Sequence, residues 1–216
     1  VASNVIAIPA ATFLTDASLG FVSDPFMPRP PYRILHLTGT AAIGGAEQVV
    51  LEVVRGADRA RFEMRVASLG GPPLLTEACL HGKPPAEAWH WRAGGPWPWR
   101  LDRLLPAIAA ARARGLDLVQ TYGLRADLVG RLLKRRFGPV RLLNSIHGTD
   151  AWRSRPKILL DRWTAGAADW FVSVSDAGSR LRAERERLDP ARITRIPKGV
   201  PLDPPGLASR EEARRT

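Results

Sequence analysis

Short apolar runs alternate along the chain with longer segments whose apolar residues recur every three or four positions. The stretch from Tyr32 to Val54 shows both patterns in turn. Its first residues form a continuous apolar run, as expected of a strand that is buried on both faces of a parallel sheet. A glycine-rich loop follows, and Val49, Val50 and Val53 then lie on one side of a helical pattern. The stretch therefore predicts a strand, a glycine loop and a helix.

The same alternation continues toward the C-terminus. We expect further strands over residues 61–69, 86–92, 116–120, 140–146, 169–174 and 192–196. The intervening helices are expected over residues 74–80, 101–114, 124–137, 156–167 and 175–188, with a later start near Pro106 as an alternative for the second of these. Units of strand and helix in this order predict an α/β fold, a Rossmann-like doubly wound parallel sheet covered by helices on both faces. Residues 32–203 are expected to form this single domain.

Residues 1–31 differ from the rest because they carry almost no charge and no sustained periodicity. We expect a disordered or loosely docked N-terminal extension that contributes little to the fold. Met27 lies just before the first strand, and a biological start at Met27 is an alternative.

The loop after the first strand carries Gly39, Gly44 and Gly45. Glycine is required where the backbone takes a positive φ or another group approaches closely, and a helix start offers unpaired N–H groups to an anion. The loop therefore predicts a phosphate or sugar-phosphate site at Gly44 and Gly45, with a plain turn as the alternative. A P-loop is excluded, because Gly45 and Ala46 stand where lysine and serine or threonine are needed. The spacing does not fit the G-x-G-x-x-G dinucleotide fingerprint either.

The charge balance changes this picture little. The chain of 216 residues has a formal net charge of +11 and a pI near 11.1, a balance that suits nucleic acids or anionic membranes. The basic residues are dispersed, however. The cluster from Arg180 to Arg187 alternates with Glu184 and Glu186, which predicts a solvated helix face. We therefore do not expect specific nucleic-acid binding.

Cys79 is the single cysteine, so an internal disulfide is excluded, and no cysteine–histidine spacing resembles a metal site. This usage agrees with a reducing, cytoplasmic location, and we expect neither a metal nor another cofactor. No apolar run approaches the roughly 18–20 residues that span a bilayer. A region rich in glycine and proline contains Trp89, Trp91, Trp97 and Trp99. These tryptophans predict a partly exposed apolar patch, with core packing as the alternative.

In a parallel sheet the loops after the strands meet at one edge, where ligands bind. These loops carry Gly44, Gly45, Tyr122, His147 and Ser175. His147 is the most informative, because an imidazole titrates near neutral pH and can bond sugar hydroxyls or phosphate. A structural histidine that bonds its own loop is the alternative. His36, in contrast, is expected to be half-buried in the first strand. The sequence lacks the paired carboxylates expected of a glycosidase and the G-x-S-x-G elbow expected of a hydrolase.

Five segments, taken together and in order, resemble the N-terminal domain of the family 4 retaining glycosyltransferases, which have the two-domain GT-B architecture. They are RILHLTGTAAIGGAEQVVLEV (33–53), GLDLVQTYGLRADLVGRL (115–132), LLNSIHGTD (142–150), ADWFVSVSDAGSRL (168–181) and ITRIPKGV (193–200). Each lies at the spacing that the family shows.

The resemblance implies an enzyme that moves a sugar from a nucleotide-sugar donor to an acceptor, retains the anomeric configuration and needs no bound metal. In that family the first glycine loop lies near the donor phosphates and the acceptor. This role falls here to Gly44 and Gly45, with Glu47 opening the following helix. The histidine after the fifth strand contacts the transferred sugar, which points to His147 as the catalytic residue. Lys198 stands where the family usually has asparagine, and we expect this lysine to meet a phosphate.

The family's second domain holds most of the donor nucleotide, and residues 204–216 resemble the linker or first helix of that domain. Donor binding and stabilisation of the leaving group need both walls of the cleft. We therefore expect this chain to be inactive alone, either as a fragment or as the partner of a separate C-terminal-domain polypeptide. A non-catalytic binding or interaction module that kept the fold is the alternative. The resemblance implies a saccharide, a lipid-linked or a small-molecule acceptor, with peripheral contact to the inner face of the membrane as an option.

Overall fold

The computed structural model describes residues 31–91, 104–148 and 153–199. They form one seven-stranded, fully parallel sheet in the order β3-β2-β1-β4-β5-β6-β7. The strands are β1 (Tyr32–Thr38), β2 (Phe62–Leu69), β3 (Glu87–Trp91), β4 (Leu118–Tyr122), β5 (Arg141–Ile146), β6 (Trp170–Ser173) and β7 (Ile193–Arg195). The predicted Rossmann-like doubly wound fold is therefore confirmed.

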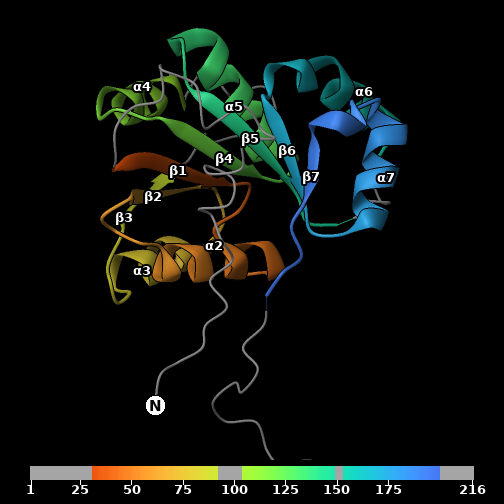
Figure 1. Ribbon diagram of the computed structural model, residues 1–216. Coiled ribbons are helices and arrows are strands. Elements are labelled where there is room, and N and C mark those ends of the chain that lie inside the picture. Colours follow the sequence, from red (N-terminus) through yellow and green to blue (C-terminus); the bar gives the residue numbers. More distant parts are fainter. Residues whose placement is uncertain (1–30, 92–103, 149–152, 200–216) are drawn as a thin grey trace, which may run out of the picture.

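Helices cover the sheet from both sides (Figure 1). Helices α2 (Gly45–Gly56) and α3 (Leu74–Leu80) lie on one face of β1–β3, and α4 (Leu105–Ala113) and α5 (Leu124–Phe137) lie on the other. Helices α6 (Arg155–Thr164) and α7 (Asp176–Glu186) follow beside β5–β7, with short 3₁₀ turns at Ala165–Ala167 and Pro190–Arg192. This division follows from topology, because right-handed crossovers change faces when the strand order changes direction.

Two apolar cores lie on the two faces because alternate residues of a strand point in opposite directions. In β1, Leu35 and Leu37 join the core beneath α4 and α5, whereas Ile34 joins the core beneath α2 and α3. The continuous apolar run read from the sequence therefore reflects burial on both faces. All three leucine and isoleucine side chains are at most 5% exposed.

Strands β1 and β4 are parallel neighbours at the centre of the sheet. The chain adds β2 and β3 on the far side of β1, and it adds β5, β6 and β7 on the far side of β4. In doubly wound folds, the connections that leave two such strands diverge to opposite faces, and the crevice between them at the C-terminal edge is the usual ligand position. The two strand ends are tied together there, since the N–H of Gly39 donates to the carbonyl of Tyr122 at 3.2 Å.

A buried network of charged side chains joins α5, α6 and α7. Asp161 of α6 is 0% exposed and accepts from Arg131 of α5 (2.6 Å), from Arg153 (2.6 Å) and from Arg182 of α7 (2.7 Å). Burial alone would raise the pKa of Asp161, but the three guanidinium groups hold it below its ordinary value. Glu186 of α7 completes the network through Arg153 and Arg182.

This network corrects the solvated helix face expected for α7. Arg182 is 3% exposed and Glu186 is 2% exposed, so this part of the alternating charge cluster turns inward. The prediction was wrong for these two residues because their ionic partners, Asp161 and Arg153, lie on distant parts of the sequence. Charge periodicity along one helix carries no information about such partners.

Other sequence predictions have mixed outcomes. Helix α4 begins at Leu105, with Leu104 as its N-cap residue, so Pro106 is the second residue of the helix and the later start is favoured. His36 is 1% exposed, so the prediction that it is half-buried was wrong.

Trp89 and Trp91 stack on one face of β3 with ring centroids 6.1 Å apart, and Trp91 is only 7% exposed. The alternative of core packing therefore holds for this pair. Outside the described residues lie Trp97, Trp99 and the expected terminal segments 1–30 and 204–216.

We predict that Asp161→Asn destabilises the protein by about 3–5 kcal/mol, because it leaves buried guanidinium groups without their shared countercharge. Urea unfolding followed by circular dichroism measures this change. Asp176→Asn is the matched control, because Asp176 forms an exposed ion pair with Arg195 (2.7 Å). It should cost about 1 kcal/mol or less. Equal destabilisation by the two variants would contradict a supporting role of the buried network.

Candidate functional site

The glycine loop after β1 leads directly into the N-terminus of α2. Gly44 is the N-cap residue, and both Gly44 and Gly45 are exposed. Glu47 is 7% exposed, and its carboxylate accepts a hydrogen bond from the backbone N–H of Gly44 at 3.1 Å. Glu47 thus fixes the shape of the loop from within. The first N–H groups of α2 lack an intrahelical acceptor, as in any helix, and Gly45, which carries the first of them, is exposed.

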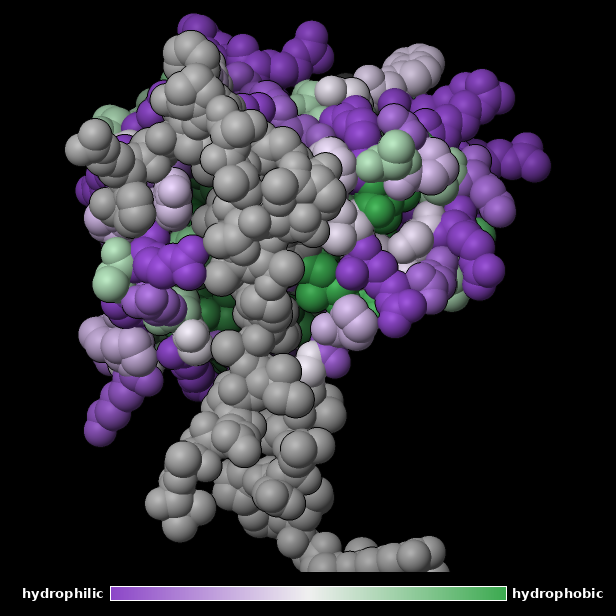
Figure 2. Space-filling view, in the orientation of Figure 1, coloured by the Kyte–Doolittle hydropathy of each residue, from purple (hydrophilic) through white to green (hydrophobic). Residues whose placement is uncertain are grey.

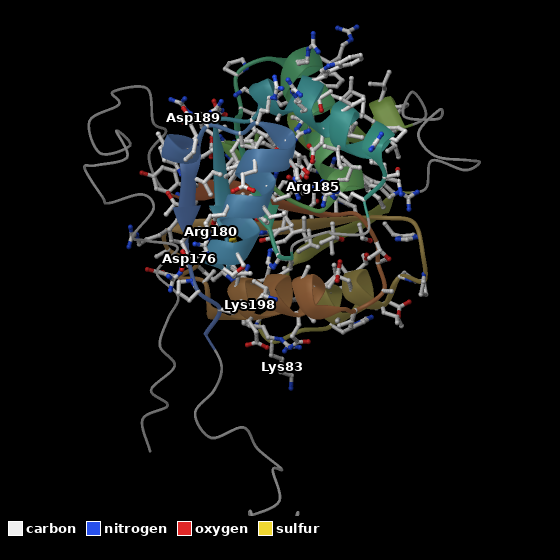
Figure 3. The ribbon with its side chains drawn as sticks, turned by 90° about the vertical axis from the view of Figure 1, so that its right-hand side faces the viewer. Lys83, Asp176, Arg180, Arg185, Asp189 and Lys198 are labelled. Atoms are coloured by element: carbon white, nitrogen blue, oxygen red, sulfur yellow. The ribbon has the colours of Figure 1, made fainter. Side chains whose placement is uncertain are left out.

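Lys198 follows β7 and reaches the same loop. Its Nζ lies 3.3 Å from the carbonyl oxygen of Gly45, and a Cβ built on Gly45 would lie 3.9 Å from it. Figure 3 shows Lys198 beside α2, at the point where the chain leaves the sheet. The structure therefore brings together the first and the last predicted site segments, which are more than 150 residues apart.

His147 follows β5 and is half-buried. Its Nδ1 is buried without a partner in the described part of the chain, which leaves Nε2 as the ring nitrogen open to a ligand. Burial, and then the positive charge of Lys198, lower the pKa of His147 from 6.5 to about 4. The imidazole is therefore neutral at physiological pH. In the tautomer that protonates Nε2, it offers one N–H donor to the crevice.

Tyr122 lies beneath His147 and does not open to solvent. It is 3% exposed, its ring centroid is 5.2 Å from that of His147, and its hydroxyl lies 2.9 Å from Nδ1 of His36. Burial raises the pKa of Tyr122 and lowers that of His36 to about 4, so this pair is neutral. Tyr122 was expected to line the ligand cleft; the structure places it as a support for the imidazole. His36 is the member of this group that sequence reasoning missed.

Ser175 caps α7, as the sequence predicted. Its hydroxyl oxygen accepts from the N–H of Gly178 at 3.1 Å, and Ser173 donates to the carbonyl of Ser175 at 2.9 Å. Within the described ranges no hydrogen bond connects Ser175 to His147 or Lys198. Its hydroxyl serves the helix start, and its contact with a ligand stays a prediction.

No group of three or more His, Cys, Asp or Glu side chains is close enough to hold a metal ion in residues 31–91, 104–148 and 153–199. No helix in those same ranges is long and apolar enough to cross a bilayer.

The crevice thus gathers a helix N-terminus, an ammonium group and a neutral imidazole. Sequence comparison adds that residues 43–204 match the model of Glycosyltransferase Family 4. The chain belongs to this family. The match includes every predicted site residue, from Gly44 to Lys198. No match was found in a search of curated proteins.

Solved structures agree with the family. The glycosyltransferase from Rickettsia africae is 20% identical, with a TM-score of 0.64 over 86% of this chain and 48% of that chain. The Anabaena protein Alr3699/HepE, in complex with UDP and glucose, is 18% identical, with a TM-score of 0.61 over 78% of this chain and 45% of that chain. A third structure is that of a putative UDP-N-acetylglucosamine 2-epimerase from Listeria monocytogenes, which is 17% identical. Its TM-score is 0.56 over 77% of this chain and 45% of that chain.

At these sequence identities, the likeness to the solved structures shows the fold alone. This fold is the Rossmann-like N-terminal domain of GT-B enzymes, which the five sequence segments predicted. The chain spans about half the length of these solved structures. Because an epimerase shares the fold, the fold by itself does not separate sugar transfer from other chemistry on nucleotide-sugars.

We predict that Lys198→Met raises the pKa of His147, because removing a nearby positive charge makes protonation easier. The pKa should remain below 6.5, because burial is the larger cause and is unchanged. A histidine-side-chain NMR titration measures it. Lys83→Met, which removes an exposed lysine elsewhere, should leave the titration unchanged. An unchanged or lowered pKa in Lys198→Met would show that Lys198 does not act on His147.

We predict that Tyr122→Phe destabilises the protein by about 1–3 kcal/mol, because it leaves Nδ1 of His36 buried and unpaired. Urea unfolding measures the change. Tyr32→Phe is the matched control: the ring centroids of Tyr32 and Phe62 are 6.1 Å apart, and the hydroxyl of Tyr32 forms no hydrogen bond with the residues that the structure describes. It should change stability by less than about 0.5 kcal/mol. If both variants unfold alike, the hydroxyl of Tyr122 does not support His36.

Proposed function

We propose that this chain is the acceptor-side half of a retaining glycosyltransferase that takes a sugar from a nucleotide-sugar donor. The observation that carries the proposal is the meeting of Lys198, the N-terminus of α2 and His147 at the crevice between β1 and β4. Membership of Glycosyltransferase Family 4 supports it. The solved structure of HepE with UDP and glucose supports the choice of donor class.

The positive end of α2 and the ammonium of Lys198 lie side by side, although like charges at a helix N-terminus repel. An anion at this place would relieve the repulsion and accept bonds from the free N–H groups at Gly45. We assign this place to a phosphate of the donor. The charge supplied by Lys198 and the helix also supports our proposal that no bound metal is needed.

His147 would act on the sugar. Because its pKa is near 4, the imidazole stays neutral and its Nε2 can donate a hydrogen bond to a sugar hydroxyl. A neutral donor suits this role, since a hydroxyl needs no countercharge. The tilted ring of Tyr122, itself held by His36, fixes the orientation of the imidazole. Such preorientation lowers the entropy lost on reaching the transition state.

We further propose that the chain alone does not turn over. The residues described here form one wall of a cleft, and leaving-group stabilisation in such reactions needs groups on the opposite wall. A further domain, in the same or a separate polypeptide, would supply them. The acceptor would be a saccharide, a lipid-linked sugar or a small molecule.

A binding experiment tests the assignment. We expect isothermal titration to show UDP-glucose binding that weakens roughly five- to ten-fold in Lys198→Met, from loss of one charge-assisted contact. His147→Ala should weaken the binding of UDP-glucose but leave the binding of UDP itself nearly unchanged, because we assign His147 to the sugar and not to the nucleotide. Lys83→Met is the control and should bind as the wild type does. Equal binding by all variants would exclude this crevice as the donor site.

A non-catalytic binding module is the second candidate, because a fold of this kind can hold a ligand without transferring it. Transfer activity separates the two. A donor-binding domain added to the chain should restore transfer from UDP-glucose to an added acceptor if the first proposal holds. Binding without transfer under those conditions would favour the module.

A further inference from the structure

The two halves of the sheet differ in how the described helices cover them. Helices α5, α6 and α7 lie on one side of β4–β7, where the ionic network around Asp161 joins them. Helices α2 and α3 lie on the other side, over β1–β3 (Figure 1). Within residues 31–91, 104–148 and 153–199, neither apolar core includes a side chain from the α2 side of β5–β7. A fully parallel sheet is normally covered on both faces.

Five side chains of β5–β7 point to the α2 side, because residues of a strand alternate between the two faces. Their neighbours mark the opposite side: Leu142 and Phe171 belong to the core beneath α4 and α5, and Asn144 accepts from Arg131 of α5 at 2.9 Å. The five are Leu143, Ser145, Trp170, Val172 and Thr194, and this set is called here the open face of β5–β7.

The polar groups of the open face are already bonded within the sheet. The indole N–H of Trp170 donates to the hydroxyl of Thr194 at 2.7 Å, and the hydroxyl of Ser145 accepts from the side-chain amide of Gln120 at 2.9 Å. A polar group that has its partner can be removed from water at little cost. The face therefore suits contact with an apolar segment.

The burial of the open face points the same way. Val172 is 8% exposed and Ser145 is 5% exposed, although no described helix lies over them, and Leu143 is half-buried. Figure 2 shows hydrophobic side chains at the surface in the region where Figure 1 places β6 and β7. Apolar side chains at such a position are stabilised when a further segment removes them from water.

The N-terminal extension has the composition that this face accepts. The charged residues of segment 1–30 are Asp16, Asp24 and Arg29, and residues 5–14 (VIAIPAATFL) carry no charge. Segments that stay unfolded combine low hydrophobicity with high charge. Residues 5–14 have the opposite composition, so their exposure to water would be unfavourable.

The extension is also long enough to reach the open face. It enters the sheet at Tyr32, and β1, β4, β5 and β6 are successive neighbours, so β6 lies three strand spacings away, about 15 Å. The roughly 17 residues between residue 14 and Tyr32 span up to about 55 Å when extended. Two other segments fit less well. Residues 204–216 are rich in charge, and residues 92–103 follow β3, at the opposite edge of the sheet.

We propose that residues 5–14 pack on the open face of β5–β7 and complete the second layer of the sheet beside α2. The extension is then part of the fold, which goes beyond the small contribution expected from its sequence. Ser145 is the register partner of Tyr122, so the docked segment would adjoin the side chain that supports His147. The inference does not rest on the proposed glycosyltransferase activity, because it concerns packing alone.

Methyl NMR of the full chain tests the inference directly. We expect nuclear Overhauser contacts between the methyl groups of Ile6 or Ile8 and those of Leu143 or Val172. Phe13→Asp should remove these contacts and lower the urea midpoint by about 1 M, because a charge in the segment opposes its burial. Phe13→Ala is the milder variant and should shift the midpoint in the same direction.

Phe26→Asp is the matched control, because it places the same charge in the same extension but outside residues 5–14. It should keep both the methyl contacts and the urea midpoint of the wild type. Two outcomes would overturn the inference. One is the absence of any contact between residues 5–14 and the open face, with Phe13→Asp and Phe26→Asp unfolding alike. The other is methyl contacts that arise only between labelled and unlabelled molecules, which would assign the open face to a second copy of the chain.

Discussion

The ammonium of Lys198 bonds the carbonyl of Gly45 at 3.3 Å, and the whole candidate site depends on this contact between the end of β7 and the start of α2. It brings a positive charge to a helix end that is itself positive. It also helps to keep His147 neutral, after burial, which is the larger cause. The crevice therefore favours an anion beside a neutral hydrogen-bond donor, and a sugar attached to a phosphate has both features.

The sequence was sufficient to predict this edge of the sheet. Alternating strands and helices leave few topologies, and right-handed crossovers place every loop that follows a strand at one edge. Gly45, His147 and Lys198 all follow strands, so their meeting required only the correct fold. The capping role of Ser175 was likewise local, because it depends on residues three positions apart.

Side-chain direction at the same edge could not be predicted. Tyr122 ends β4, and whether its hydroxyl points to the crevice or to the interior depends on His36, 86 residues away. The carboxylate of Glu47 turns back to accept from the N–H of its own N-cap residue, Gly44. The same limit explains Arg182 and Glu186 of α7, whose buried partners come from the loop before α6 and from α6 itself. Local periodicity identifies elements, while burial of a charge is decided by tertiary partners.

We propose that the start of α2, His147 and Lys198 form one binding site. NMR chemical-shift mapping with UDP-glucose tests it most directly. If they form one site, the signals of the backbone amides of Gly44 to Glu47, the imidazole of His147 and the ammonium of Lys198 should shift together and saturate with one dissociation constant. Shifts that leave these three groups unmoved, or that saturate at different concentrations for each, would contradict it.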